Sequence, residues 1–147
     1  MQLITYLTFG GNCEEVINFY KEAIGAEVLF FTRMGDGQME TPEHLKSKVM
    51  HARLKIGENT LYMSDTFDPS AVNYGNNISL SLQMDNAGKL ETVFNKLSEG
   101  GTVKMPLQKT FWAEKFGMFT DKFGIHWMMN FELSETTSAD RKEASLN

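Results

Sequence analysis

Apolar residues recur at helical spacing in two stretches of the chain, and shorter stretches alternate apolar and polar residues. Over Cys13 to Ile24, apolar side chains return every three or four positions, which predicts a helix that Gly25 ends. A similar apolar stripe predicts a second helix near residues 87–99, ended by Gly100. The alternating stretches, which lie before, between and after the two helices, predict strands.

The predicted strands complete a repeated order of elements. They lie at residues 3–9, 27–33, 49–56, 59–65, 78–84 and 102–107, with a final hairpin over 108–130 whose turn is at 120–124. The order strand, helix, strand, strand, strand therefore occurs twice. This predicts an α+β protein built from paired βαβββ units.

The repeat also predicts how the chain is divided. The first unit spans residues 1–66, a polar linker with Pro and Gly spans 67–77, and the second unit spans 78–132. Residues 133–147 have no apolar period and are predicted to be a disordered polar tail. Residues 34–48 form a long predicted loop, which we expect to close over or border a site.

Composition narrows the classes of partner. The 147 residues are 41% hydrophobic and 22% charged, as in an ordinary globular protein. A net charge of -5 with no basic stripe argues against nucleic acid or an anionic membrane as partner. The single Cys13 excludes an intrachain disulfide, and no signal-like segment or long apolar run occurs, so we expect a cytoplasmic protein.

Three stretches carry a resemblance to a known family. They are FGGNCEEVINFYKEAIGAE at 9–27, HARLKIGENTLYMSD at 51–65 and QKTFWAEKFGMFTDKFGIHWMMN at 108–130. Together they resemble the vicinal oxygen chelate superfamily, which has the glyoxalase and bleomycin-resistance fold, and most closely its PhnB-like branch. The resemblance implies a homodimer and curved mixed or antiparallel sheets around a cleft. The methyltransferase label often given to this branch finds no support, because no Gly-rich strand–turn–helix for a methyl donor occurs.

The resemblance also bears on metal binding. Glyoxalase-type enzymes hold a divalent metal with His and Glu from four strands, and the matching positions here are Thr5, Met63, Ser79 and Met128. Hydroxyls and thioethers are poor ligands for the metals of this superfamily, so we predict no metal and no cofactor. A slip of one or two residues in this match would bring in Asp65 or His126.

Alternation along the strands selects residues that could line a ligand site. Ser79, Ser81 and Gln83 share one face of their strand, as do His51 and Arg53 on another. The candidate ligand-binding residues are Thr5, His51, Arg53, Met63, Asp65, Ser79, Ser81, Phe111, Trp112, Trp127 and Met128. The two methionines and the aromatic hairpin are alternatively core, and His51 is alternatively a solvent-facing or hydrogen-bonded strand residue.

Three functions fit these observations. The first, which we predict, is a metal-free dimer that binds a small organic molecule. The second is a metal-dependent lyase, isomerase or dioxygenase of the glyoxalase superfamily. The third is a structural or regulatory dimer with a vestigial cleft. Neither catalysis nor the identity of the ligand follows from the sequence.

Overall fold

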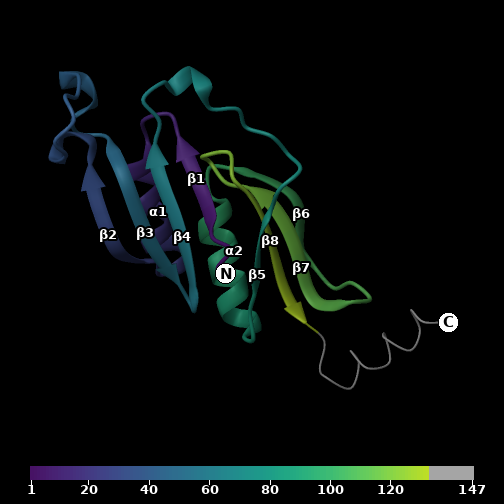
Figure 1. The fold of residues 1–147 in the computed structure, drawn as a ribbon. Helices are drawn as coiled ribbons and strands as arrows, with labels where there is room; N and C mark the ends of the chain where they lie inside the picture. The colour runs from purple at the N-terminus through teal and green to yellow at the C-terminus, as the bar shows by residue number, and fades with distance from the viewer. Residues whose placement is uncertain (133–147) are drawn as a thin grey trace. The chain divides into compact units, whose positions relative to one another are not determined.

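The computed structural model describes residues 1–132 and divides the chain into two compact units (Figure 1). The first unit spans Met1–Asn73, and the second begins at Tyr74. This division falls inside the predicted linker, while the predicted unit boundaries at 66 and 78 stay predictions. The predicted tail lies outside the described residues.

The first unit is a four-stranded mixed sheet with one helix on a single face. The sheet order is β1-β4-β3-β2, with β1 parallel to β4 and the other pairs antiparallel. In Figure 1 the helix lies behind this sheet. The elements are β1 (Thr5–Phe9), α1 (Cys13–Ile24), β2 (Glu27–Arg33), β3 (Val49–Ile56) and β4 (Asn59–Asp65).

The second unit repeats this arrangement. Its sheet order is β5-β8-β7-β6, again with one parallel pair, β5 with β8. The elements are β5 (Leu80–Gln83), α2 (Ala87–Ser98), β6 (Thr102–Gln108), β7 (Ala113–Thr120) and β8 (His126–Glu132). The predicted α+β class and the βαβββ order of both units are confirmed.

Helix α1 has the buried apolar stripe and the terminal glycine that the sequence predicts. Its buried side chains include Val16 and Tyr20, and Gly25 ends it in the left-handed conformation, with φ at 74°. Asn12 directly precedes the helix but makes no side-chain cap hydrogen bond. The carboxylate of Asp65 accepts from the Cys13 N–H instead, at 3.0 Å, so the cap comes from strand β4.

Helix α2 packs very closely on its sheet. Asn86 caps it, and its side chain accepts from the Lys89 N–H at 2.9 Å. The Phe94 ring meets Phe119 of β7 edge to face, with centroids 5.0 Å apart. A Cβ added to Gly117 would lie 2.7 Å from the Phe94 ring, so only glycine allows this approach.

The long loop between β2 and β3 is anchored rather than loose at its base. It contains two short 3-10 turns, Met34–Asp36 and Glu43–Leu45. The Met34 side chain is buried, and its N–H donates to the Lys48 carbonyl at 2.9 Å. Whether the exposed part of this loop borders a ligand stays a prediction.

One predicted hairpin contains a correction. The turn between β7 and β8 lies where the sequence places it, with Asp121 N–H donating to the Ile125 carbonyl at 2.8 Å. However, β7 begins only at Ala113. Trp112 was expected on an arm of the hairpin and lies instead in the connection between β6 and β7, together with Phe111. Within residues 1–132 no helix has the length and apolar character needed to cross a membrane.

Candidate functional site on the first sheet

The two faces of the first sheet differ in chemistry. Ala52, Leu54 and Met63 are buried on the face that packs against α1. The side chains between them in sequence point to the other face, because strand residues alternate. Arg53 and Tyr62 are paired in register there, and this second face, which we call the open face, collects polar and aromatic groups.

Five side chains from all four strands meet on the open face, and we call them the first-sheet cluster. They are Tyr6, Phe30, His51, Arg53 and Tyr62. The His51 ring lies at the centre, 5.1 Å from Tyr62, 5.7 Å from Tyr6 and 5.9 Å from Phe30, measured between ring centroids. The Arg53 guanidinium carbon lies 4.9 Å from the Tyr62 ring centroid and 5.5 Å from that of Phe30.

The hydrogen bonds of the cluster fix where the protons lie. Arg53 Nε donates to His51 Nε2 at 3.2 Å, so Nε2 must be the unprotonated nitrogen of the ring. The pKa of His51 is lowered from its ordinary value of 6.5, mainly by burial and to a lesser extent by the positive charge of Arg53. The ring is therefore neutral near pH 7. Nδ1 therefore carries the hydrogen and donates to the Tyr6 hydroxyl, 3.1 Å away.

The structure keeps two of the predicted site residues of the first unit together and moves three elsewhere. His51 and Arg53 belong to the first-sheet cluster. Thr5 and Met63 instead share their faces with Leu61 and Leu7, and Met63 is 0% exposed. Both residues therefore lie on the face opposite to that of His51 and Arg53. The open-face residues of β1 and β4 are Tyr6 and Tyr62, one position away in each strand.

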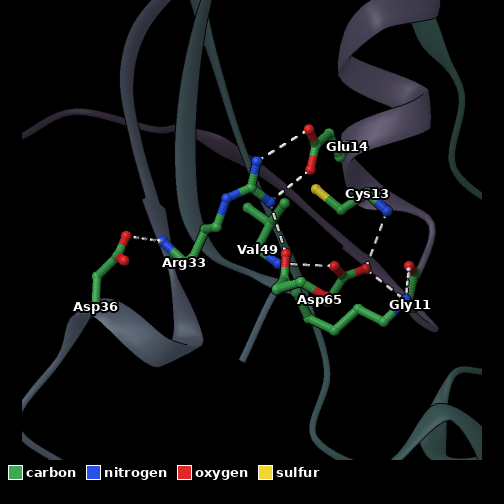
Figure 2. Close-up of polar contacts among 9 residues, drawn as sticks. Gly11, Cys13, Glu14, Arg33, Asp36, Val49 and Asp65 are labelled. Carbon is green, nitrogen blue, oxygen red and sulfur yellow. Dashed lines mark hydrogen bonds and ion pairs between the residues drawn. The ribbon is translucent and has the colours of Figure 1, made fainter. Parts of the chain in front are cut away.

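Asp65 also leaves the candidate site, because it holds the backbone together (Figure 2). It is 5% exposed and accepts three backbone N–H groups. Its Oδ1 accepts from Gly11 at 2.9 Å and Cys13 at 3.0 Å, and its Oδ2 accepts from Val49 at 2.9 Å. A carboxylate with both oxygens engaged in this way is a structural group rather than a free base.

The same corner contains the thiol of Cys13 and the ion pair between Arg33 and Glu14. The Cys13 thiol is buried, and its burial together with the charges of Asp65 and Glu14 raises its pKa, which makes it a poor nucleophile. Arg33 forms a two-pronged ion pair with Glu14, at 2.6 and 3.0 Å, and donates to the Ser47 carbonyl (Figure 2). The hydrogen bond from Arg33 is the main reason that the pKa of Glu14 is lowered. Both residues anchor α1 and the 34–48 loop.

The second sheet distributes its candidates over both faces. Met128 lies in register with Ser81 and Met118, on the face away from α2. Ser79 precedes β5, on the same side by alternation. Trp127 is 2% exposed on the α2 side, and its Nε1 donates to Asp121 Oδ2 at 2.9 Å, so its expected role as a cavity wall is corrected to a core role.

The remaining aromatic candidates are the exposed Phe111 and the half-buried Trp112, which contact each other and the buried Phe116. The rings of Phe111 and Trp112 meet edge to face with centroids 4.8 Å apart, and Trp112 meets Phe116 at 5.4 Å. Nearby in register, Asn130 was not among the candidates but is buried, and its Nδ2 donates to Gln83 at 3.1 Å. Its Oδ1 is buried without a hydrogen-bond partner among residues 1–132.

The residues present do not fit a glyoxalase-type metal. Across the described chain, no group of three or more His, Cys, Asp or Glu side chains is arranged to hold a metal ion. On the first sheet the open face carries Tyr6 and Tyr62, and on the second sheet the face away from α2 carries Ser79 and Met128. Phenols, a hydroxyl and a thioether do not make the nitrogen and carboxylate set that such metals prefer. The alternative His126 is engaged elsewhere, with Nε2 2.7 Å from the Gly75 carbonyl.

Comparison with known proteins places the chain in a family. The model of the Glyoxalase/Bleomycin resistance protein/Dioxygenase superfamily matches residues 3–129. Protein YjdN of Escherichia coli (strain K12) is 34% identical over 148 residues, which cover 93% of this chain and 99% of that protein.

Solved structures agree with this assignment. Protein PA1353 from Pseudomonas aeruginosa is 42% identical with a TM-score of 0.80, covering 91% of this chain and 99% of that one. A PhnB protein from Bacillus cereus is 26% identical with a TM-score of 0.77, covering 89% and 99%. The chain therefore belongs to the glyoxalase, bleomycin resistance protein and dioxygenase superfamily, in its PhnB-like branch.

Proposed function

We propose that this protein binds a small organic molecule on the open face of its first sheet, without a resident metal. The observation that carries the proposal is the first-sheet cluster, in which Tyr6, His51 and Arg53 form a hydrogen-bonded chain beside the rings of Phe30 and Tyr62. A few polar groups among aromatic side chains are the usual composition of a small-molecule site.

The alternative of a metal-dependent lyase, isomerase or dioxygenase has less support. Metal-assisted proton abstraction next to a carbonyl needs an electrophile and a base. The polar groups of the first-sheet cluster are two phenols, an imidazole and a guanidinium, and the carboxylate of Asp65 is already occupied by three backbone N–H groups. This set is suited to recognition rather than to Lewis-acid chemistry.

A thermal-shift experiment separates the candidate functions. Protein dialysed against a chelator would be screened with a panel of small organic molecules, each with and without added Zn²⁺, Ni²⁺, Mn²⁺ or Fe²⁺. A ligand that binds the folded state raises Tm by mass action, and we expect organic molecules to do so equally with and without metal. A rise that requires the metal would support the enzyme instead, and no rise with any compound would support a structural or regulatory dimer.

We also propose that the protein is a cytoplasmic homodimer. Its edge strand β2 exposes Val28 and Leu29, and an exposed apolar edge is normally covered by a partner. A second copy of the chain would supply that cover in a closed, symmetric assembly. Sedimentation at micromolar concentration should give twice the 16.7 kDa of one chain. A mass equal to one chain would contradict the dimer but not the binding site.

A further inference from the structure

We propose that the ligand of the first-sheet cluster is a planar organic anion, of which an aromatic carboxylate is the simplest example. Its oxyanion would pair with Arg53 and the Tyr6 hydroxyl, while its ring would pack on the exposed aromatic side chains. The inference rests on the proposed function and narrows it to one chemical class of ligand.

Arg53 carries a charge that the described protein leaves unmatched. Among residues 1–132 it forms no ion pair, in contrast to Arg33, which Glu14 holds at 2.6 and 3.0 Å. Across the strands Arg53 lies opposite Phe30 and Tyr62, whereas the carboxylate of Glu27 lies opposite Lys55. A guanidinium without a protein carboxylate is available to a carboxylate from the ligand.

The geometry also prepares Arg53 to use two donors at once. Its Nε is engaged with His51, and the rings of Phe30 and Tyr62 lie beside its guanidinium carbon. The guanidinium is thereby oriented, while its two terminal nitrogens have no hydrogen-bond partner in the described part of the chain. Two parallel N–H groups match the two oxygens of a carboxylate.

Tyr6 supplies a third donor through its contact with His51. His51 Nδ1–H donates to the Tyr6 oxygen, so the phenol hydrogen is not used within the cluster. That hydrogen can be donated to an acceptor on the ligand. His51 is therefore a positioning residue, which holds both Tyr6 and Arg53 from its two nitrogens.

The aromatic side chains explain why the anion should be organic. Tyr6 and Phe30 are 48% and 47% exposed, and their aromatic side chains place an apolar surface beside the donors. An inorganic anion would use the donors and leave this surface in water. A planar ring attached to the oxyanion would cover it, with the added stability of ring stacking.

Three probe molecules, which differ in whether they carry a ring and a charge, test the proposal. Their binding would be measured by calorimetry or ligand-observed NMR. Benzoate has both the ring and the charge, benzamide keeps the ring without the charge, and acetate keeps the charge without the ring. We expect benzoate to bind about tenfold or more tightly than either of the others. Benzamide loses the charge-assisted contact, and acetate loses the burial of the ring.

Substitutions identify the residues responsible. Arg53→Gln should weaken benzoate binding by about 10- to 100-fold, the value of a hydrogen bond to a charged group. The matched control is Lys55→Gln, which removes one positive charge from the same face of the same strand and should weaken binding by less than about fivefold. Tyr6→Phe should weaken benzoate binding more than benzamide binding, because a hydrogen bond to a charged carboxylate oxygen is stronger than one to a neutral amide oxygen. All three substitutions change exposed side chains, and an unchanged circular dichroism spectrum would verify that each variant folds.

The outcomes separate this inference from the function on which it rests. Equal binding of benzoate and benzamide, both lost in Tyr62→Ala, would overturn the anion while preserving a small-molecule site in the cluster. Equal effects of Arg53→Gln and Lys55→Gln would also overturn it, since binding would then follow net charge alone. Benzoate binding that is unaffected by Arg53→Gln, Tyr6→Phe and Tyr62→Ala would overturn both the inference and the proposed site.

Discussion

Replacing Asp65 with alanine is expected to lower the free energy of unfolding by about 3 kcal/mol or more. The change leaves three backbone N–H groups, those of Gly11, Cys13 and Val49, without their acceptor in a buried corner. An unsatisfied buried donor costs more than an ordinary hydrogen bond contributes. Urea denaturation of the variant and of the unchanged protein would measure the difference.

Asp68→Ala is the matched control for this experiment. Asp68 is an exposed carboxylate that also accepts a backbone N–H, from Ser70 at 3.0 Å, but water can replace it there. We expect a loss of about 1 kcal/mol or less. Asp65→Asn should fall between the two, because one amide oxygen remains as acceptor. Similar losses for Asp65→Ala and Asp68→Ala would contradict the structural role of Asp65.

Trp127→Ala is expected to cost about 3–5 kcal/mol, the usual range for removing a large aromatic side chain from a core. Trp127 is 2% exposed and joins the α2 side of the second sheet to Asp121 through its Nε1. Thermal and urea unfolding would both report the loss. A merely ligand-facing tryptophan would give a much smaller effect on stability.

Trp112→Ala provides the comparison, since its side chain is only half-buried and lies outside the strands. We expect its loss of stability to be less than half that of Trp127→Ala. Binding experiments on Trp127→Ala cannot distinguish loss of a contact from loss of folding, whereas Trp112→Ala can be interpreted directly. Equal destabilisation by the two changes would contradict the placement of Trp127 in the core.

The order of elements could be predicted because it depends on local signals. The apolar stripe of α1, the Gly25 that ends it and the Asn86 that caps α2 all act within a few residues. The alternation of β3 likewise separates Ala52 and Leu54 from His51 and Arg53, and the burial of these side chains agrees with it. Such signals survive folding because each residue's neighbours in sequence are its neighbours in the element.

The sequence match between the two repeats pairs strand residues that lie on opposite kinds of face in the two units. A shift of one residue is enough to cause this. The match paired Met63 with Met128, but Met63 faces α1 while Met128 faces away from α2. The neighbours of Met128 in β8, Trp127 and Met129, are the residues buried on the α2 side. Because strand side chains alternate with a period of two, a shift of one reverses every assignment. The apolar pattern of Leu61 and Met63 was the signal that could have corrected it.

The other missed features depend on contacts between distant residues. Asp65 caps α1 from more than fifty positions away, whereas Asn12, directly before the helix, makes no side-chain cap hydrogen bond. The first-sheet cluster likewise joins Tyr6 to His51 across 45 positions. Tyr6 follows Thr5 in a short strand of mixed character, and nothing local shows which of the two faces the polar side.

Ligand binding on the open face of the first sheet can be mapped residue by residue by NMR. Isotope-labelled protein would be titrated with benzoate while the signals of Tyr6, His51, Arg53 and Tyr62 are followed. We expect saturable shifts of the signals of these four residues, while the signals of Trp127 and Asp65 stay unchanged. Shifts centred on residues of the second sheet such as Ser81 and Met128, with the first-sheet cluster unmoved, would contradict it.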